Sequence, residues 1–308
     1  MATEPRRRVD ASYRVSANKG MEKLQAAVEI CGLSKVFRNF WHRPIVTALT
    51  NLELEVAQGE IFGLLGPNGS GKSTTIKLLL GLLHPSSGSA RVLGGSPRDV
   101  RLKARLGYLP EDSPFYPHLS AEETLHFYGS LFALPKKILR ERVAELLGLV
   151  GLQGSRARLV GEFSKGMLRR LGLAQSLVND PDLLILDEPT AGMDPIGTRE
   201  VKDLLLDLKR RGKTIILSSH LLADVEDVCD RVAILHEGRL EALGSIASLL
   251  ADDQRTQITT DRLAPSTIEA LIALLREHEG QKINILIGSP SARLEAFFIK
   301  TVESGAPP

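Results

Sequence analysis

The 308-residue sequence carries 39 lysines and arginines against 37 aspartates and glutamates, which gives a formal net charge of +2. Its 43% hydrophobic content is typical of a globular protein and argues against a disordered or fibrous chain. No run of about 20 apolar residues is present, so the sequence predicts no membrane-spanning helix. The balanced charge argues against a dedicated nucleic-acid-binding protein, which usually carries a basic excess on one face. The two cysteines, Cys31 and Cys229, form no disulfide framework and fit a reducing cytosol.

The length allows one large domain or one domain with a smaller partner, at roughly 150 residues per domain. Changes in composition divide the chain into a polar, flexible leader over residues 1–25, a main domain over 26–247 and a C-terminal appendage over 248–308. Either Met1 or Met21 can be the start of the natural protein.

The first part of the main domain has the pattern of strands followed by a helix. Alternating or clustered apolar residues predict strands over residues 27–31, 47–56 and 60–65. Helical spacing over residues 74–83 follows, and Pro85 with Gly88 closes this segment.

Residues 119–180 are predicted to be mostly helical. Ser120 and Glu123 have the spacing of a capping box, in which the serine accepts from a free helix amide and the glutamate reaches back. A helix is therefore expected to begin at Ser120.

The last part of the main domain returns to strands. Two short apolar runs bounded by polar residues predict strands buried on both faces of a parallel sheet, over residues 183–186 and 214–217. Residues 232–235 and 239–242 flank a Glu-Gly pair and predict a hairpin. The appendage is expected to form a strand, a helix, a strand and a helix, over residues 257–260, 267–278, 283–287 and 292–302.

A glycine-rich phosphate-binding motif follows the predicted strand at 60–65. It consists of Gly66, Pro67, Asn68, Gly69, Ser70, Gly71, Lys72, Ser73 and Thr74. A strand before such a loop and a helix after it are the context in which backbone amides and a helix N-terminus form an anion site. We expect Lys72 to reach the β- and γ-phosphates of a nucleotide and the Ser73 hydroxyl to bind Mg²⁺. An ordinary glycine-rich turn is the alternative, which this context disfavours.

Two carboxylates, Asp187 and Glu188, end the predicted strand at 183–186. The carboxyl ends of strands in open α/β sheets are where ligands bind. We expect Asp187 to hold Mg²⁺, directly or through water, and Glu188 to polarise the water that attacks the γ-phosphate. Adjacent acids at a strand end are also common on protein surfaces, so this interpretation depends on the phosphate motif.

Three further segments carry a resemblance to a known family. Residues 163–167, Phe-Ser-Lys-Gly-Met, lie about ninety residues after Lys72 and resemble the signature motif of ATP-binding cassette (ABC) proteins, usually Leu-Ser-Gly-Gly-Gln. Residues 191–194, which end in Asp194, resemble the D-loop of these proteins, and His220 resembles their switch histidine. The resemblance covers about residues 27 to 245, with five motifs in the right order.

The resemblance assigns roles to further residues. Phe37 stands where an aromatic ring stacks on adenine, and Glu111 stands where the Q-loop usually has a glutamine that ligates Mg²⁺ and contacts a membrane partner. His220 is expected to act with Glu188 in hydrolysis, by contacting the γ-phosphate and orienting the water or the base. The signature residues that would contact ATP in a second subunit are Ser164, Lys165, Gly166 and Met167.

The signature segment departs from the common form at Phe163, Lys165 and Met167. Ser164 and Gly166 remain, and they supply a hydroxyl donor and a backbone amide at the start of a helix. We therefore expect the contact with ATP to survive these changes. The carboxylate at Glu111 is also a departure, since it adds a charge that glutamine lacks.

The fold implied by the resemblance is an α/β P-loop NTPase core with a mostly parallel sheet. An antiparallel β subdomain, a helical subdomain bearing the signature and a small C-terminal α+β appendage would complete it. The implied function is ATP hydrolysis in the nucleotide-binding subunit of an ABC exporter, with ATP and Mg²⁺ as cofactors.

The expected partners are a second copy of the chain and separate transmembrane permease subunits, with no nucleic acid. The expected location is cytoplasmic and peripheral, on the inner face of the cell membrane. The alternative is a non-transport ABC ATPase acting on ribosomes or DNA. Such proteins usually carry a second cassette or long coiled coils, neither of which this sequence contains. A P-loop kinase or GTPase is a third interpretation, but it would need an acceptor site and would not explain the signature segment at residues 163–167.

Overall fold

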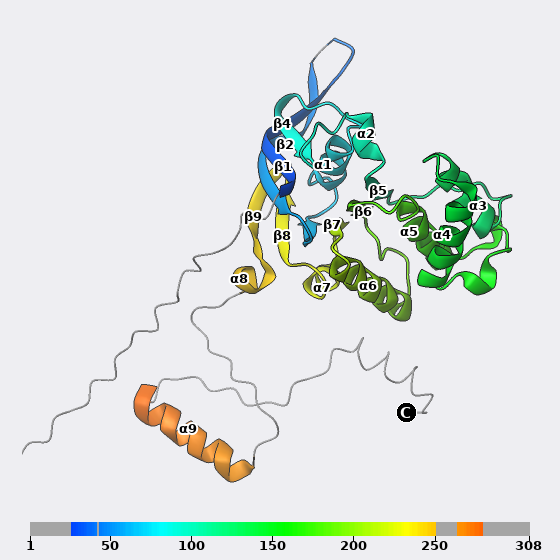
Figure 1. The fold of residues 1–308 in the computed structure, drawn as a ribbon. Helices are drawn as coiled ribbons and strands as arrows, with labels where there is room; N and C mark the ends of the chain where they lie inside the picture. Colours follow the sequence, from blue (N-terminus) through cyan, green and yellow to red (C-terminus); the bar gives the residue numbers. More distant parts are fainter. Residues whose placement is uncertain (1–25, 42, 251–263, 280–308) are drawn as a thin grey trace, which may run out of the picture.

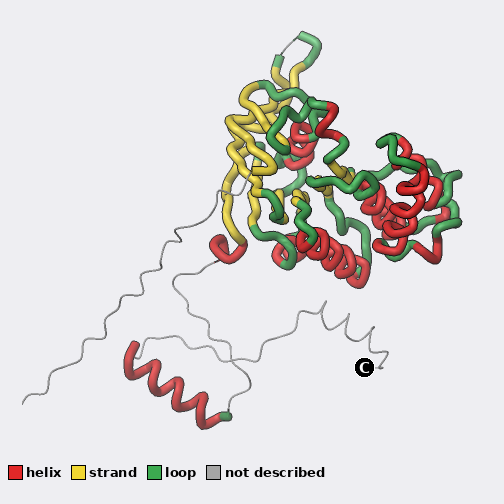
Figure 2. The backbone as a smooth tube through the Cα atoms, in the orientation of Figure 1, coloured by secondary structure: helices red, strands yellow, loops and turns green. Residues whose placement is uncertain are grey.

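The computed structural model describes residues 26–41, 43–250 and 264–279. Two β-sheets lie beside one another, and a lobe of helices extends from the edge of the larger sheet (Figure 1). Figure 2 shows the same division, with the strands gathered in one part and helices forming the lobe. No helix in the described ranges is long and apolar enough to cross a membrane.

A three-stranded antiparallel sheet has the order β2-β1-β4. Its strands are β1 (Ala26–Arg38), β2 (Pro44–Ala57) and β4 (Ser87–Val92). Both β1 and β2 run further than the predicted 27–31 and 47–56. The pairing of β1 with β2 shifts register around Gly32, which has φ +58°, and such a bulge lets a strand continue through polar residues that break the alternating pattern.

The larger sheet has six strands in the order β5-β6-β7-β3-β8-β9. They are β3 (Ile61–Leu65), β5 (Leu106–Leu109), β6 (Leu183–Asp187), β7 (Thr214–Ser219), β8 (Arg231–His236) and β9 (Arg239–Ser245). The first five in this order pair in parallel, and β9 pairs with β8 as the predicted antiparallel hairpin. The structure thus confirms the expected mostly parallel sheet with an antiparallel β unit beside it.

Both faces of the larger sheet are buried. Along β6, Leu183 and Ile185 join the core shared with the antiparallel sheet, whereas Leu184 and Leu186 join the core under the helices. All five residues of β3 and of β6 are buried. The apolar runs therefore formed strands because each face had a layer to pack against.

Helices cover the larger sheet. They are α1 (Lys72–Leu79), α2 (Val100–Lys103), α6 (Pro195–Arg210), α7 (Leu222–Glu226) and α8 (Ile246–Leu250). The helix predicted over 74–83 is α1, which ends at Leu79 because Gly81 turns the chain with φ +66°.

The helical lobe consists of α3 (Ala121–Ser130), α4 (Lys136–Leu149) and α5 (Lys165–Ser176), with 3₁₀ turns at Gln153–Ser155 and Val160–Glu162. The predicted capping box is confirmed, because the Ser120 hydroxyl accepts from the Glu123 amide at 3.2 Å and the Glu123 carboxylate accepts from the Ser120 amide at 2.8 Å. This lobe carries the signature segment at the start of α5.

In the C-terminal region, α9 (Pro265–Glu279) confirms the helix expected over 267–278. The other expected elements of the appendage, at 257–260, 283–287 and 292–302, lie outside the described residues. The leader over 1–25 lies outside them as well.

Candidate functional site

The glycine-rich loop joins β3 to α1 and depends on glycine at two points. Gly66 has φ +147°, and a Cβ there would lie 2.2 Å from the carbonyl oxygen of Leu235. Gly71 has φ +109° and caps the N-terminus of α1. Only glycine enters both conformations without strain, so the loop wraps closely and leaves the first amides of α1 at its centre.

Two donors in this loop suit a phosphate. Lys72 is 7% exposed, and its ammonium donates to the carbonyls of Gly66 at 2.6 Å and Pro67 at 3.2 Å. The Ser70 hydroxyl is buried and has no hydrogen-bond partner within the described residues. A buried hydroxyl without a partner is costly, and a phosphate oxygen would satisfy it. The loop therefore has the shape and the donors of an anion site.

Asp187 and Glu188 stand at the end of β6, as predicted, and both are almost fully buried. The Ser218 hydroxyl at the end of the neighbouring strand β7 donates to the Asp187 carboxylate. The same hydroxyl accepts from the Glu188 amide at 3.1 Å. Glu188 has φ +54°, a strained conformation for a residue with a side chain, and such strain is often found at functional sites.

The structure brings Glu188 and His220 together. The Nδ1 atom of His220 lies 2.9 Å from Oε1 of Glu188, although the two residues are 32 positions apart. The Glu188 side chain is 8% exposed and that of His220 is 52% exposed. A buried carboxylate that contacts a partly exposed imidazole is an arrangement suited to activating a water molecule.

The oxygen donors near the phosphate loop fit a magnesium ion. Ser73 is the second residue of α1, which packs against β6, the strand that carries Asp187. A hydroxyl and a carboxylate are the hard oxygen ligands that Mg²⁺ prefers, and it usually takes only one or two from the protein. Glu111 is exposed just after β5, the strand next to β6 in the sheet.

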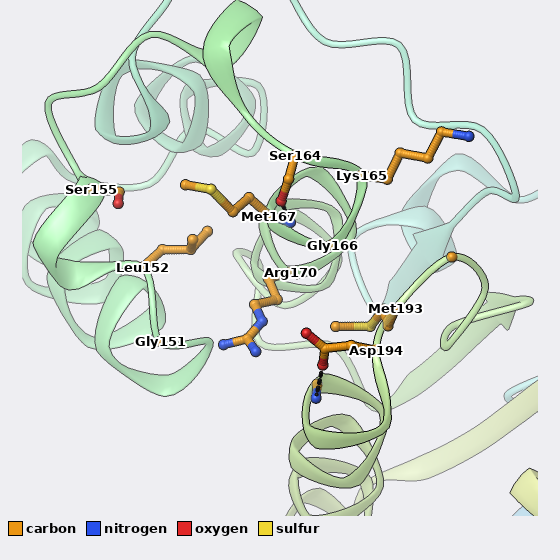
Figure 3. Close-up of a pocket in the computed structure, with 12 residues that line it drawn as sticks. Gly151, Leu152, Ser155, Ser164, Lys165, Gly166, Met167, Arg170, Met193 and Asp194 are labelled. Carbon is orange, nitrogen blue, oxygen red and sulfur yellow. Dashed lines mark hydrogen bonds between the residues drawn. The ribbon is translucent and has the colours of Figure 1, made fainter. Parts of the chain in front are cut away.

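The signature segment begins α5. The Ser164 hydroxyl accepts from the Met167 amide at 3.3 Å and so caps this helix. Figure 3 shows the pocket at this point, with Ser164 and Arg170 of the α5 segment on one side and Asp194 at the start of α6 on the other. The Met167 side chain extends toward Leu152, and the Lys165 side chain extends away from the pocket. Asp194 in turn caps α6 by accepting from the Gly197 amide at 2.6 Å.

The signature pocket lies apart from the phosphate loop of the same chain, because α5 belongs to the helical lobe and α1 to the sheet core (Figure 1). The pocket exposes the N-termini of α5 and α6, which both carry partial positive charge. One chain therefore does not bring its own signature residues to its own phosphate loop.

Phe37 lies near the end of β1 and is 37% exposed. The Lys35 ammonium lies 5.1 Å from the centre of its ring. Phe37 is thus a surface aromatic rather than a core residue, as stacking on a base requires.

Sequence reasoning missed two residues that organise this site. Ser218 links Asp187 to the Glu188 amide, and Arg169 on α5 donates to backbone carbonyls on either side of the site. The position of Ser218 at a strand end, two residues before His220, was a signal that could have identified it. Nothing local distinguishes Arg169.

Known proteins that resemble this chain point to one family. Residues 49–191 match the family described as ABC transporter. A fluoroquinolones export ATP-binding protein of Mycobacterium tuberculosis is 44% identical over 216 residues, which are 70% of this chain and 70% of that protein. This chain belongs to the ABC transporter family. An ABC transporter ATP-binding protein of Synechocystis is 45% identical over 234 residues, which are 75% of this chain. The chain spans 66% of the length of that relative.

Solved structures support the same fold for the ABC chain. The ATP-binding subunit of an ABC transporter superposes with a TM-score of 0.64 at 31% identity, covering 72% of this chain and 91% of that one. A cbiO1 protein of Clostridium perfringens, part of a cbiONQ transporter complex, gives a TM-score of 0.65 at 28% identity, with 74% and 92% covered. The expected P-loop NTPase fold is therefore confirmed.

Proposed function

We propose that this ABC chain hydrolyses ATP as the nucleotide-binding subunit of an exporter. The observation that carries the proposal is the contact between Glu188 and His220 at the end of β6, beside the carboxylate of Asp187. A base, its orienting partner and a candidate metal ligand thus meet in one place. The glycine-rich loop that would hold the phosphates precedes α1, which packs against the same strand.

Each of these residues has a distinct task in hydrolysis. The Lys72 ammonium and the Ser70 hydroxyl bind phosphate oxygens, with the amides that begin α1. Glu188 accepts the proton of the attacking water, and His220 holds the carboxylate and contacts the γ-phosphate. Ser73 and Asp187, with Glu111, would hold Mg²⁺, which neutralises charge on the phosphates.

The proposed active form is a dimer with two-fold symmetry. The separation of the signature pocket from the phosphate loop supports it, because a second copy would place Ser164 and Gly166 over the nucleotide of the first. The D-loop residue Asp194 would lie at the same interface. ATP would then join the subunits, and hydrolysis would release them.

Separate transmembrane subunits would dock on the helical lobe near Glu111, at the inner face of the cell membrane. Exposed apolar residues support this location. Tyr116 and Phe127 are 49% and 41% exposed, and Leu131 is 67% exposed. The rings of Tyr116 and Phe127 contact edge to face, with their centres 5.6 Å apart. Such a patch is typical of a protein interface. Relatives named for fluoroquinolone export and Nod factor export support export as the direction.

The shared site can be tested by mixing two inactive variants. Lys72→Ala removes the phosphate contact, and Gly166→Asp places a carboxylate in the signature. In a mixed dimer, one site carries both changes and the other carries neither. If the two sites act independently, an equimolar mixture should regain about a quarter of wild-type ATP hydrolysis, since half of the dimers are mixed and each has one intact site.

The control is each variant alone at the same total concentration, which should hydrolyse no ATP. A mixture as inactive as its components would contradict a site shared between two copies. Full activity of either variant alone would contradict the role given to the changed residue.

A further inference from the structure

Arg169 lies in the first half of α5, five residues after Ser164, which caps the helix. Arg169 is 5% exposed. Within the described part of the chain, every hydrogen bond of its guanidinium goes to a backbone carbonyl. The acceptors are the carbonyl oxygens of Pro110 at 2.6 Å, Glu111 at 2.9 Å and Pro189 at 3.2 Å, together with those of Asp187 and Glu188. One side chain therefore joins three parts of the chain.

These acceptors belong to the two segments that the mechanism uses. The first segment follows β5 and contains Glu111, and the second follows β6 and contains Asp187 and Glu188. Because β5 and β6 are neighbours in the sheet, their carboxyl ends lie side by side, and Arg169 fills the position between them and α5. The helix that begins with the signature is thus tied directly to the base.

The chemistry of the contacts separates this arginine from an ordinary ion pair. A buried guanidinium is expensive unless its donors are satisfied, and here carbonyl dipoles satisfy them. The side-chain carboxylates of Asp187 and Glu188 remain turned toward Ser218 and His220. Arg169 therefore holds the main chain in place without occupying the groups that act on ATP.

The backbone of Glu188 is where this support matters most. Its φ of +54° is strained for a glutamate, and a strained conformation persists only when its surroundings determine it. The Glu188 amide donates to Ser218 and its carbonyl accepts from Arg169, so both ends of the residue are fixed.

We propose that Arg169 is a positioning residue for hydrolysis, which fixes the Glu188 backbone to the signature helix through carbonyl contacts with the segments after β5 and β6. This inference rests on the proposed ATPase function. The proposal separates nucleotide binding from the chemical step, because the hydrogen bonds of Arg169 go to the segments after β5 and β6 and not, among the described residues, to the phosphate loop. Loss of Arg169 should slow the chemical step and leave ATP binding intact.

The test compares full-length Arg169→Met, Arg169→Lys and Arg142→Met. Arg142 on α4 is the control, since its guanidinium also donates to a carbonyl, that of Leu177 at 3.1 Å. Its other partners are the carboxylates of Glu145 and Asp180, which do not belong to the segments that Arg169 holds. For each variant, kcat and KM for ATP, the Kd of a fluorescent ATP analogue and the melting temperature are measured.

Arg169→Met should lower kcat about 100-fold, the scale expected when a catalytic group is misplaced by about 1 Å, with Kd within about twofold of wild type. Arg169→Lys should regain part of kcat, because it keeps the charge but fewer of the contacts. Arg142→Met should lower the melting temperature and leave kcat within about threefold of wild type.

Several results would overturn the role of Arg169: an unchanged kcat in Arg169→Met, a Kd lost in parallel with kcat, or an equal fall of kcat in Arg142→Met. If Arg169→Met does not fold, Arg169→Lys decides, and wild-type kcat in a folded Arg169→Lys would overturn the proposal. An inactive wild-type chain would instead contradict the proposed function.

Discussion

The contact between Ser218 and the two carboxylate residues yields a prediction for stability. Ser218 is fully buried, and its hydroxyl donates to the buried carboxylate of Asp187. Ser218→Ala removes that donor and leaves a buried charge with one contact fewer. A hydrogen bond to a charged group contributes about 1.5–3 kcal/mol, so we expect a loss of about 2 kcal/mol. The Glu188 amide loses less, because it also donates to the Ser218 carbonyl at 3.2 Å.

Thermal unfolding without nucleotide measures this loss. A change of about 2 kcal/mol should lower the melting temperature by about 4–8 °C in a domain of this size. Ser176→Ala is the matched control, since Ser176 is also buried, but its hydroxyl donates to the Leu173 carbonyl at 2.8 Å within α5 and not to a carboxylate. Ser176→Ala should change the melting temperature little, because alanine favours the helix. Equal melting temperatures for the two variants would refute the reasoning.

Four further predictions concern ATP binding, folding stability, the pH dependence of stability and thiol reactivity. Lys72→Ala should abolish ATP binding in a fluorescence titration, and a wild-type titration curve would refute the phosphate site. Ser120→Ala removes the capping box with Glu123 and should destabilise the chain by about 1 kcal/mol in urea unfolding, with KM for ATP unchanged. Burial raises the pKa of the Cys229 thiol, and the nearby Asp230 raises it further. As the pH rises, this thiol therefore ionises in the unfolded chain before it ionises in the folded chain. The free energy of unfolding should then fall as the pH rises above about 8.5. Iodoacetamide should therefore modify the exposed Cys31 in the native protein and Cys229 only on unfolding, which mass spectrometry would detect.

Local patterns predicted the parts of the fold that depend on nearby residues. The capping box at Ser120, the run that became β6 and the glycine-rich loop before Lys72 each contain their own determinants within a few residues. The predicted extent of β1 was too short. The strand continues because of a bulge at Gly32 and because it pairs with a strand further along the chain.

The candidate site divides in the same way. Motif spacing placed Asp187, Glu188 and His220 at the ends of strands, and the structure brings the last two into contact. The contacts of Arg169 and Ser218 could not be predicted. Arg169 donates to the Glu188 carbonyl and Ser218 donates to the Asp187 carboxylate, and the fold of the sheet brings these distant parts of the chain together. Such contacts have no spacing rule in the sequence.

The central claim, that Glu188 is the base of an ATP-hydrolysing dimer, is tested most directly with Glu188→Gln. Glutamine keeps the shape of the side chain but cannot accept the proton of the attacking water. With Mg²⁺ and ATP, the variant should bind nucleotide, elute as a stable dimer on size exclusion and lose about 100-fold or more of its hydrolysis rate. Undiminished hydrolysis by this variant would contradict the account.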